Sequence, residues 1–108
     1  MPISSDLLRG HTDTIILAQL ARGDNYGYEI NKNIQQLTNE EYGLKEATLY
    51  TAFKRLEQSG LIRSYWGEEG AGARRRYYAI IDEGRTQLEE RRQEWAHTRD
   101  LLNALIAE

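Results

Sequence analysis

The chain has 108 residues, of which 40% are hydrophobic and 29% are charged, and its formal net charge is −3. This length and this ordinary composition predict one globular domain and exclude a wholly disordered or collagen-like chain. The longest apolar cluster, Ile15 to Ala18, is too short for a membrane-spanning helix, and we expect no signal peptide. Because cysteine is absent, disulfides and thiolate chemistry are excluded, and we expect a protein of the reducing cytoplasm.

The charges are distributed unevenly along the chain. Residues 45–76 contain 7 basic and 4 acidic residues, a balance of +3, whereas the rest of the chain contains 7 basic and 13 acidic residues, a balance of −6. A basic segment within an acidic frame suits a protein that presents one face to a polyanion. Random scatter explains the same counts equally well, so the charge distribution alone leaves both interpretations open.

Apolar residues recur with a helical period in four segments, at about residues 5–22, 26–38, 45–59 and 83–107. Gly23 and Gly60 stand where the first and third of these helices should end. Asn25 and Asp82 are the expected N-caps of the second and fourth helices. At 1.5 Å per residue, the last helix would be roughly 35–40 Å long.

Two β-prone runs, Leu61 to Trp66 and Arg74 to Ile81, lie between the third and fourth helices and are joined by the glycine-rich residues 67–72. This pattern predicts a hairpin. Three helices, a hairpin and one long helix are the layout of a winged helix-turn-helix protein, in which the hairpin is the wing. We therefore predict a mainly α fold with a small β-hairpin wing: a DNA-binding domain over residues 1–81, and a C-terminal dimerisation helix over residues 82–108.

The third predicted helix has two contrasting faces. On a helical wheel, Leu49, Phe53 and Leu56 fall on one side. The other side carries small residues, hydroxyls, an amide and two cations, namely Ala47, Thr48, Thr51, Lys54, Arg55 and Gln58. Hydroxyls and amides can hydrogen-bond base edges, and cations neutralise phosphates, so this face is typical of a recognition helix in a major groove. The solvated face of any amphipathic helix has a similar composition.

The wing carries three consecutive arginines, Arg74, Arg75 and Arg76. Because side chains alternate along a strand, Arg74 and Arg76 should share one face and Arg75 should occupy the other. Such a run can bind phosphates or enter a minor groove. Charges on an edge strand also discourage aggregation, which is the alternative explanation.

The last predicted helix has an apolar stripe at sevenfold spacing, Leu88, Trp95 and Leu102. A helix of this length cannot bury the whole stripe against one small domain, so it is predicted to form a dimer, unless it folds back on its own domain. Arg92 and Arg99 lie one turn on either side of Trp95. Two symmetry-related tryptophans could line a slot for a planar ligand, whereas a plain interface anchor is the alternative.

Four sequence motifs lie at Gly23 to Ile30, Glu46 to Glu57, Gly60 to Ile62 and Arg74 to Tyr78. Together they resemble the motifs of the PadR family of winged-helix transcriptional regulators, and the resemblance covers nearly the whole chain. It points to the branch of the family with a single C-terminal helix. The resemblance implies a homodimer that represses a nearby transporter or detoxification operon from an inverted-repeat operator of double-stranded DNA.

The resemblance also implies site residues. Those that match the family's DNA-contacting positions are Thr48, Tyr50, Thr51 and Lys54 on the third helix and Arg74 and Arg75 on the wing. Trp95 matches a tryptophan that stacks on planar drugs at the dimer centre, and we expect Leu7 of the first helix beside it. Arg92 and Arg99 replace an aromatic and an acidic residue of the drug-binding relatives, which predicts a preference for neutral or anionic planar compounds.

An enzymatic function is not favoured by the sequence. The two histidines, His11 and His97, lie on separate predicted helices without catalytic or metal-ligand spacing, so we expect no catalytic residues, metal or cofactor. The remaining alternative is a constitutive DNA-binding regulator or a protein-interaction module without a small-molecule ligand. An interaction module would explain the long helix but not the three arginines.

Overall fold

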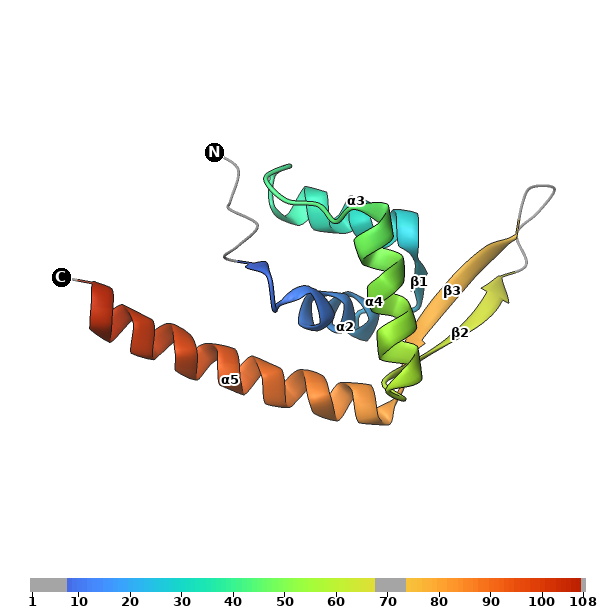
Figure 1. Cartoon of the computed structure of the whole chain (residues 1–108). Helices are drawn as coiled ribbons and strands as arrows, with labels where there is room; N and C mark the ends of the chain where they lie inside the picture. Colours follow the sequence, from blue (N-terminus) through green and yellow to red (C-terminus); the bar gives the residue numbers. More distant parts are fainter. Residues whose placement is uncertain (1–7, 68–73, 108) are drawn as a thin grey trace.

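The computed structural model describes residues 8–67 and 74–107 of the chain. The elements in chain order are α2 (Thr12–Ala21), β1 (Asn25–Tyr26), α3 (Gly27–Leu37), α4 (Glu46–Gln58), β2 (Ile62–Gly67), β3 (Arg75–Ile80) and α5 (Asp82–Ile106) (Figure 1). The predicted fold class is therefore confirmed: three helices are followed by a β-hairpin wing and one long helix. The two ends of the hairpin are described, whereas its predicted glycine-rich connection lies mostly outside the described residues.

The hydrophobic core lies where α2, α3 and α4 meet the base of the sheet. Its largest fully buried side chains are Ile16, Leu17, Leu20, Ile30, Phe53 and Leu56. The ring of Phe53 stacks on Tyr78 of β3, with centroids 3.9 Å apart and planes 14° from parallel. This stacked contact packs α4 against the sheet and buries both rings.

The sheet has three antiparallel strands in the order β1-β3-β2. Its short first strand was not predicted from the sequence, which assigned Asn25 as the N-cap of the next helix. That assignment is wrong: Asn25 pairs with Tyr78, its side chain accepts a hydrogen bond from the Tyr26 amide at 2.9 Å, and Tyr26 is the N-cap of α3. Pairing with β3 outweighs the capping preference of asparagine here.

The first predicted helix, residues 5–22, is shorter in the structure. Gly10 has a φ of +83°, a left-handed conformation that interrupts a helix, and α2 begins only at Thr12. The His11 amide donates to the Leu8 carbonyl at 3.0 Å, which closes a turn ahead of α2. Leu7, which we expected near the ligand site, lies outside the described residues.

One side chain holds the connection between α3 and α4. The amide of Asn31 on α3 donates to the Leu44 carbonyl at 2.9 Å and accepts from the Leu44 backbone N–H at 2.7 Å. Both backbone groups of a buried residue just before α4 are therefore satisfied by α3. The orientation of α4 relative to α3 depends on this reciprocal pair.

Helix α4 ends in a Schellman motif. The Leu61 amide donates to the Leu56 carbonyl at 3.0 Å, and the amide of Gly60, whose φ is +74°, donates to the Glu57 carbonyl at 3.1 Å. The end predicted at Gly60 is thus confirmed, and the chain turns directly into β2. Helix α5 has Ile81 as its N-cap, so the expected cap Asp82 is instead its first residue.

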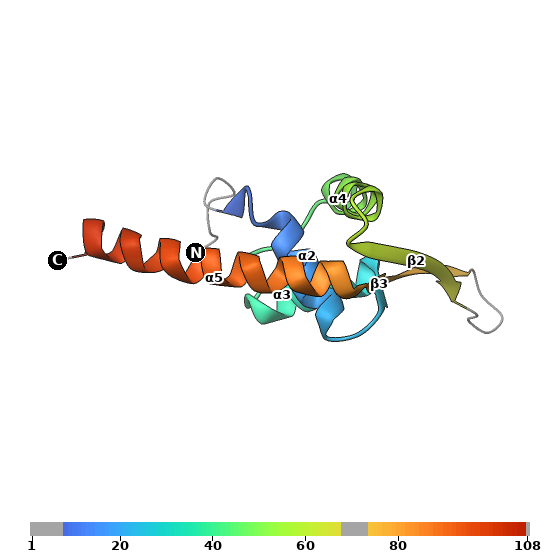
Figure 2. The same cartoon turned by 90° about the horizontal axis from the view of Figure 1, so that it is seen from below.

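Helix α5 packs against α2 with its first half and then extends past the domain (Figures 1 and 2). Leu88 is buried in the core, whereas Leu102, Leu105 and Ile106 are exposed, to 78% for the last two. The radius of gyration, 15.4 Å, exceeds the roughly 13 Å of a compact domain of this length. No helix within the described ranges is long and apolar enough to span a membrane.

Candidate nucleic-acid interface

The outer face of α4 is exposed as the helical wheel predicted. Leu49, Ala52, Phe53 and Leu56 are buried, whereas Ala47, Thr48, Thr51, Lys54 and Gln58 are exposed. The exposed side presents two threonine hydroxyls and a lysine ammonium within two helical turns. It can therefore offer both directional hydrogen bonds and a positive charge to a polyanion.

Tyr50 has a partly structural role. Its ring meets Phe53 edge-on, with centroids 5.6 Å apart, and it covers the start of α3 so closely that a Cβ on Gly27 would lie 2.6 Å from the tyrosine hydroxyl. The side chain is still 45% exposed. Tyr50 thus joins the two helices of the helix-turn-helix and keeps one side of its ring accessible.

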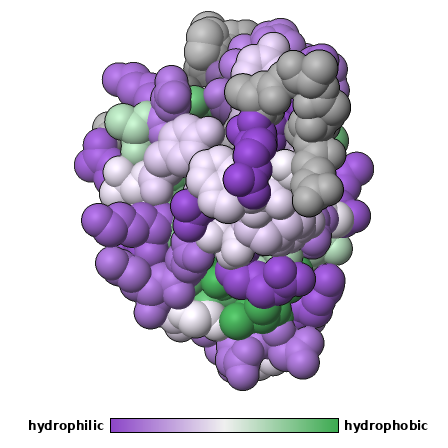
Figure 3. Space-filling model, turned by 90° about the vertical axis from the view of Figure 1, so that its right-hand side faces the viewer, coloured by the Kyte–Doolittle hydropathy of each residue, from purple (hydrophilic) through white to green (hydrophobic). Residues whose placement is uncertain are grey.

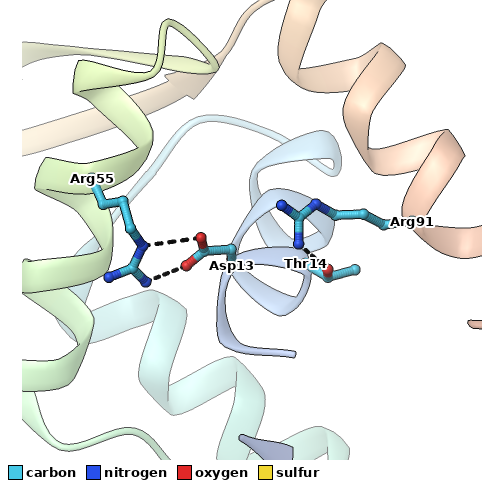
Figure 4. A network of polar contacts seen from close by, with 4 residues as sticks. All are labelled: Asp13, Thr14, Arg55 and Arg91. Atoms are coloured by element: carbon cyan, nitrogen blue, oxygen red, sulfur yellow. Dashed lines mark hydrogen bonds and ion pairs between the residues drawn. The ribbon is translucent and has the colours of Figure 1, made fainter. Parts of the chain in front are cut away.

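Arg55 binds a carboxylate of the neighbouring helix (Figure 4). Its Nε donates to Oδ2 of Asp13 on α2 at 3.1 Å, and its Nη2 donates to Oδ1 of the same carboxylate. These hydrogen bonds raise the pKa of the arginine above its usual value, because they favour the charged form. No sequence pattern indicated Asp13 as the partner of Arg55, because 42 residues separate the two along the chain.

The arginines of the wing divide between its two faces, which confirms the predicted alternation. The guanidinium carbons of Arg74 and Arg76 lie 5.5 and 5.6 Å from the ring centroid of Trp66, whereas that of Arg75 lies 4.8 Å from the centroid of Tyr26 on the other face. Arg76 also donates to Oγ of Ser64 at 2.7 Å. Arg74 and Arg75, the two predicted contact residues, are both exposed.

A polar cluster ties the wing to α4. The hydroxyl of Ser64 on β2 donates to Oε2 of Glu57 on α4 at 2.7 Å, and Arg76 lies 3.9 Å from Oε1 of the same carboxylate. Burial raises the pKa of Tyr78, which neighbours this cluster. The wing and α4 are thereby held as one unit.

A row of tyrosines crosses the outer face of the sheet. Tyr26, Tyr77 and Tyr65 are aligned in register across β1, β3 and β2, and adjacent centroids are 5.5 and 5.7 Å apart. The Tyr65 hydroxyl donates to Oδ2 of Asp24 at 2.6 Å, which raises the pKa of Tyr65. This row was not predicted from the sequence, because it depends on the register between the three strands.

The molecular face at the wing end is largely hydrophilic. In Figure 3, hydrophilic side chains surround a central area of intermediate hydropathy, and strongly apolar side chains form only a small area lower down.

A second feature that was not predicted from the sequence is a cavity of about 510 Å³ between α3 and α4, whose lining includes Tyr28, Lys32 and Tyr50. Tyr28 is 71% exposed beside it. These groups can donate hydrogen bonds to a phosphate backbone.

Three of the four predicted ligand residues, Arg92, Trp95 and Arg99, lie on α5, whereas Leu7 is outside the described residues. Trp95 is 46% exposed, and its ring meets the ring of His11 edge-on with centroids 5.3 Å apart. Arg92 lies 4.0 Å from Glu89, and Arg99 lies 3.4 Å from Asp100, so each guanidinium has a carboxylate beside it. His11, which the sequence analysis placed inside the first helix, precedes α2 and contacts the tryptophan.

The helix pair α3 and α4, with the outer face of α4 exposed beside an arginine-bearing wing, defines the class of protein as winged helix-turn-helix DNA-binding proteins. The model of the PadR-like family of transcriptional regulators matches residues 16–90. The chain therefore belongs to the PadR family and is a transcriptional regulator.

Similar proteins extend over nearly the whole chain. A transcriptional regulator from Clostridium thermocellum is 51% identical with a TM-score of 0.88, covering 96% of this chain and 98% of that one. A PadR family regulator from Clostridium difficile is 40% identical with a TM-score of 0.78, covering 90% and 99%. An uncharacterised protein from Lysinibacillus sphaericus is 42% identical over 104 residues, covering 96% and 95%.

Proposed function

We propose that the protein is a homodimeric repressor that binds an inverted-repeat operator and responds to a planar aromatic compound. In this proposal α4 reads the major groove, Arg74 and Arg75 contact the backbone, and the exposed end of α5 joins two subunits. The regulated genes encode a transporter or a detoxification enzyme, and the regulator acts in the cytoplasm. The observation that carries the proposal is the exposed outer face of α4, with Thr48, Thr51 and Lys54 side by side.

The DNA-binding part is tested with a labelled duplex from the region upstream of the protein's own gene. Lys54→Ala and Arg75→Ala should weaken binding to all sequences and each reduce the slope of log K against log salt by about one, because each removes a phosphate contact. Thr51→Ala should instead change the preference among sequences. Unchanged affinity in both Lys54→Ala and Arg75→Ala would reject the proposed interface.

The dimer is supported by the continuity of one helical stripe. Leu88 is buried in the core of its own subunit, and the ring of Trp95 meets His11 just before α2. Leu102 and Ile106 continue the same helical stripe toward the end of α5 and are exposed to 46% and 78%. Unpartnered apolar side chains in this arrangement are typical of an interface with a second copy.

The ligand site is supported by the half-exposed ring of Trp95 in the middle of this stripe. A symmetry-related ring would complete a stacking slot, which by itself discriminates little among flat molecules. Charge then sets the preference. Arg92 and Arg99 of both subunits place four guanidiniums around the slot, and Glu89 and Asp100 offset part of that field. We therefore expect neutral or anionic aromatics to bind better than cationic ones.

The ligand proposal is tested by quenching of tryptophan fluorescence with size-matched cationic and anionic aromatic compounds. The anionic compound should bind more tightly to the wild-type protein, and Trp95→Ala should lose the quenching while Trp66 continues to report on the wing. Tighter binding of the cation would reject the charge argument, and quenching that survives Trp95→Ala would reject the slot. An effect of the bound compound on DNA affinity distinguishes a sensor from a constitutive regulator.

A further inference from the structure

Among the residues that the structure describes, the guanidinium of Arg55 is held from one side. Asp13 occupies the Nε–H and one N–H of Nη2, which together form the side edge of the planar group (Figure 4). A guanidinium has five N–H donors, so two donors on Nη1 and one on Nη2 remain. Within the described ranges, Asp13 is the one hydrogen-bonding partner of the Arg55 guanidinium. The edge formed by Nη1 and Nη2 is therefore available.

Arg55 is the solvent-exposed member of the ion pair. The side chain of Arg55 is 52% exposed, whereas that of Asp13 is 19% exposed. The more buried carboxylate thus acts as a fixed support, and the free edge of the guanidinium belongs to the exposed member. Because Asp13 already holds two of the five donors in place, Arg55 loses less rotamer entropy when it binds a further group.

The surroundings of Arg55 belong to the outer face of α4. A shallow cavity of about 290 Å³ is lined by Thr12, Ala47, Thr48, Thr51 and Arg55. Thr48, Thr51 and Arg55 are spaced three and four residues apart, so they follow one another along a single stripe of the helix. A group bound by Arg55 would therefore lie beside groups bound by the two threonines.

We propose that Arg55 reads a guanine in the major groove and that Asp13 is the residue that positions it. The inference rests on the proposed function, since it requires α4 to enter a major groove. Guanine presents two acceptors there, O6 and N7, which match two parallel N–H donors of an arginine. A phosphate contact fits the pair less well, because the carboxylate of Asp13 cancels most of the positive charge that a phosphate would attract.

The experiment begins with selection of binding sites from a pool of randomised duplexes by the full-length wild-type protein. We expect a guanine at one fixed position of each half-site. Replacing that guanine should lower the affinity of the wild-type protein about 5- to 150-fold, the range of a bidentate base contact. In Arg55→Ala the same replacement should have no effect, and in Asp13→Asn its effect should shrink several-fold.

A modified base tests the contact itself. 7-Deazaguanine at the selected position removes the N7 acceptor and leaves base pairing intact, so the wild-type protein should lose about tenfold in affinity and Arg55→Ala should lose none. Lys54→Ala is the matched control on the same helix. It should weaken binding to both duplexes equally and retain the wild-type sensitivity to 7-deazaguanine.

A double variant separates positioning from a general effect of charge. Asp13→Asn removes a negative charge, so it should raise the affinity for unrelated duplexes while it lowers the preference for guanine. In the Arg55→Ala background, Asp13→Asn should leave the base preference unchanged, because its effect on reading passes through the arginine. Circular dichroism confirms that each variant is folded at the temperature used.

The outcomes distinguish this inference from the proposed function. A wild-type protein that binds no duplex would overturn both. A protein that selects a consistent site, whose guanine preference and 7-deazaguanine sensitivity persist in Arg55→Ala, would overturn the guanine contact alone. Loss of these properties in Arg55→Ala with full retention in Asp13→Asn would overturn the positioning role of Asp13.

Discussion

At the residue scale, Gly84 shows how closely α5 approaches the wing. A Cβ at this position would overlap the carbonyl oxygen of Leu61 and lie 2.7 Å from Cγ1 of Ile80. Gly84→Ala should therefore destabilise the protein by about 1–3 kcal/mol, although alanine is normally the better helix former. Urea unfolding followed by circular dichroism measures the change. Thr98→Ala, at an exposed site of the same helix, is the control, and an unchanged midpoint in Gly84→Ala would contradict the predicted clash.

Tyr78 makes stability depend on pH at the alkaline end. Burial raises the pKa of its hydroxyl, so the folded state holds the proton more tightly than the unfolded state, in which the pKa is about 10. This contribution is fully present below pH 10 and is lost as the pH rises through the higher pKa of the folded state.

Tyr78→Phe should accordingly flatten the fall in the free energy of unfolding above pH 10, measured by urea titrations at successive pH values. The exposed Tyr28 provides the control, because Tyr28→Phe should leave the slope as in the wild type. If the free energy of unfolding falls equally steeply with pH in the wild type and in Tyr78→Phe, Tyr78 is not the cause of the pH dependence.

At the scale of elements, the Asn31 side chain holds the start of α4. Asn31→Ala would leave both backbone groups of Leu44 without their partner, which should cost about 1–3 kcal/mol and speed hydrogen exchange of the Leu44 amide. Because α4 then loses its fixed orientation, DNA affinity should fall as well. Gln36→Ala, at an exposed position on the same helix, serves as the reference. A Leu44 amide that exchanges as slowly as in the wild type would refute the role of Asn31.

The elements differ in how well the sequence predicts them. Helical periodicity located α3, α4 and α5 to within one residue at each end, because each carries a regular apolar stripe. Strand β1 has only two residues and exists through its pairing with β3, which no local pattern reveals. Gly10 interrupts the first predicted helix although the flanking residues keep a helical period.

The candidate site was predictable on the same terms. The exposed face of α4 and the alternation of the wing arginines follow from the periods of helix and strand. The partner of Arg55, the ring that covers Gly27 and the contact of His11 with Trp95 join residues far apart in the chain. Such contacts depend on how the elements pack, so one sequence alone does not specify them.

At the scale of the whole molecule, the projecting stripe of α5 predicts the mode of association. Leu102→Asp with Ile106→Asp should shift the protein to monomers in sedimentation equilibrium, because two carboxylates would be desolvated in the proposed interface. The buried Leu88 is retained, so the domain should stay folded. His97→Asp with Ala104→Asp adds the same charge on the opposite side of the helix and should remain dimeric. A dimer that persists in the first variant would place the interface elsewhere.

The length of α5 has a mechanical consequence. Its 25 residues form a rod of about 37 Å, packed on the domain near one end and projecting at the other. If two such rods are joined at their projecting ends, each works as a lever, and a tilt of about 5° at the joint moves the opposite end by about 3 Å. Successive base pairs are about 3.4 Å apart, so this small rotation is enough to shift one DNA-binding domain relative to the other by roughly one base pair.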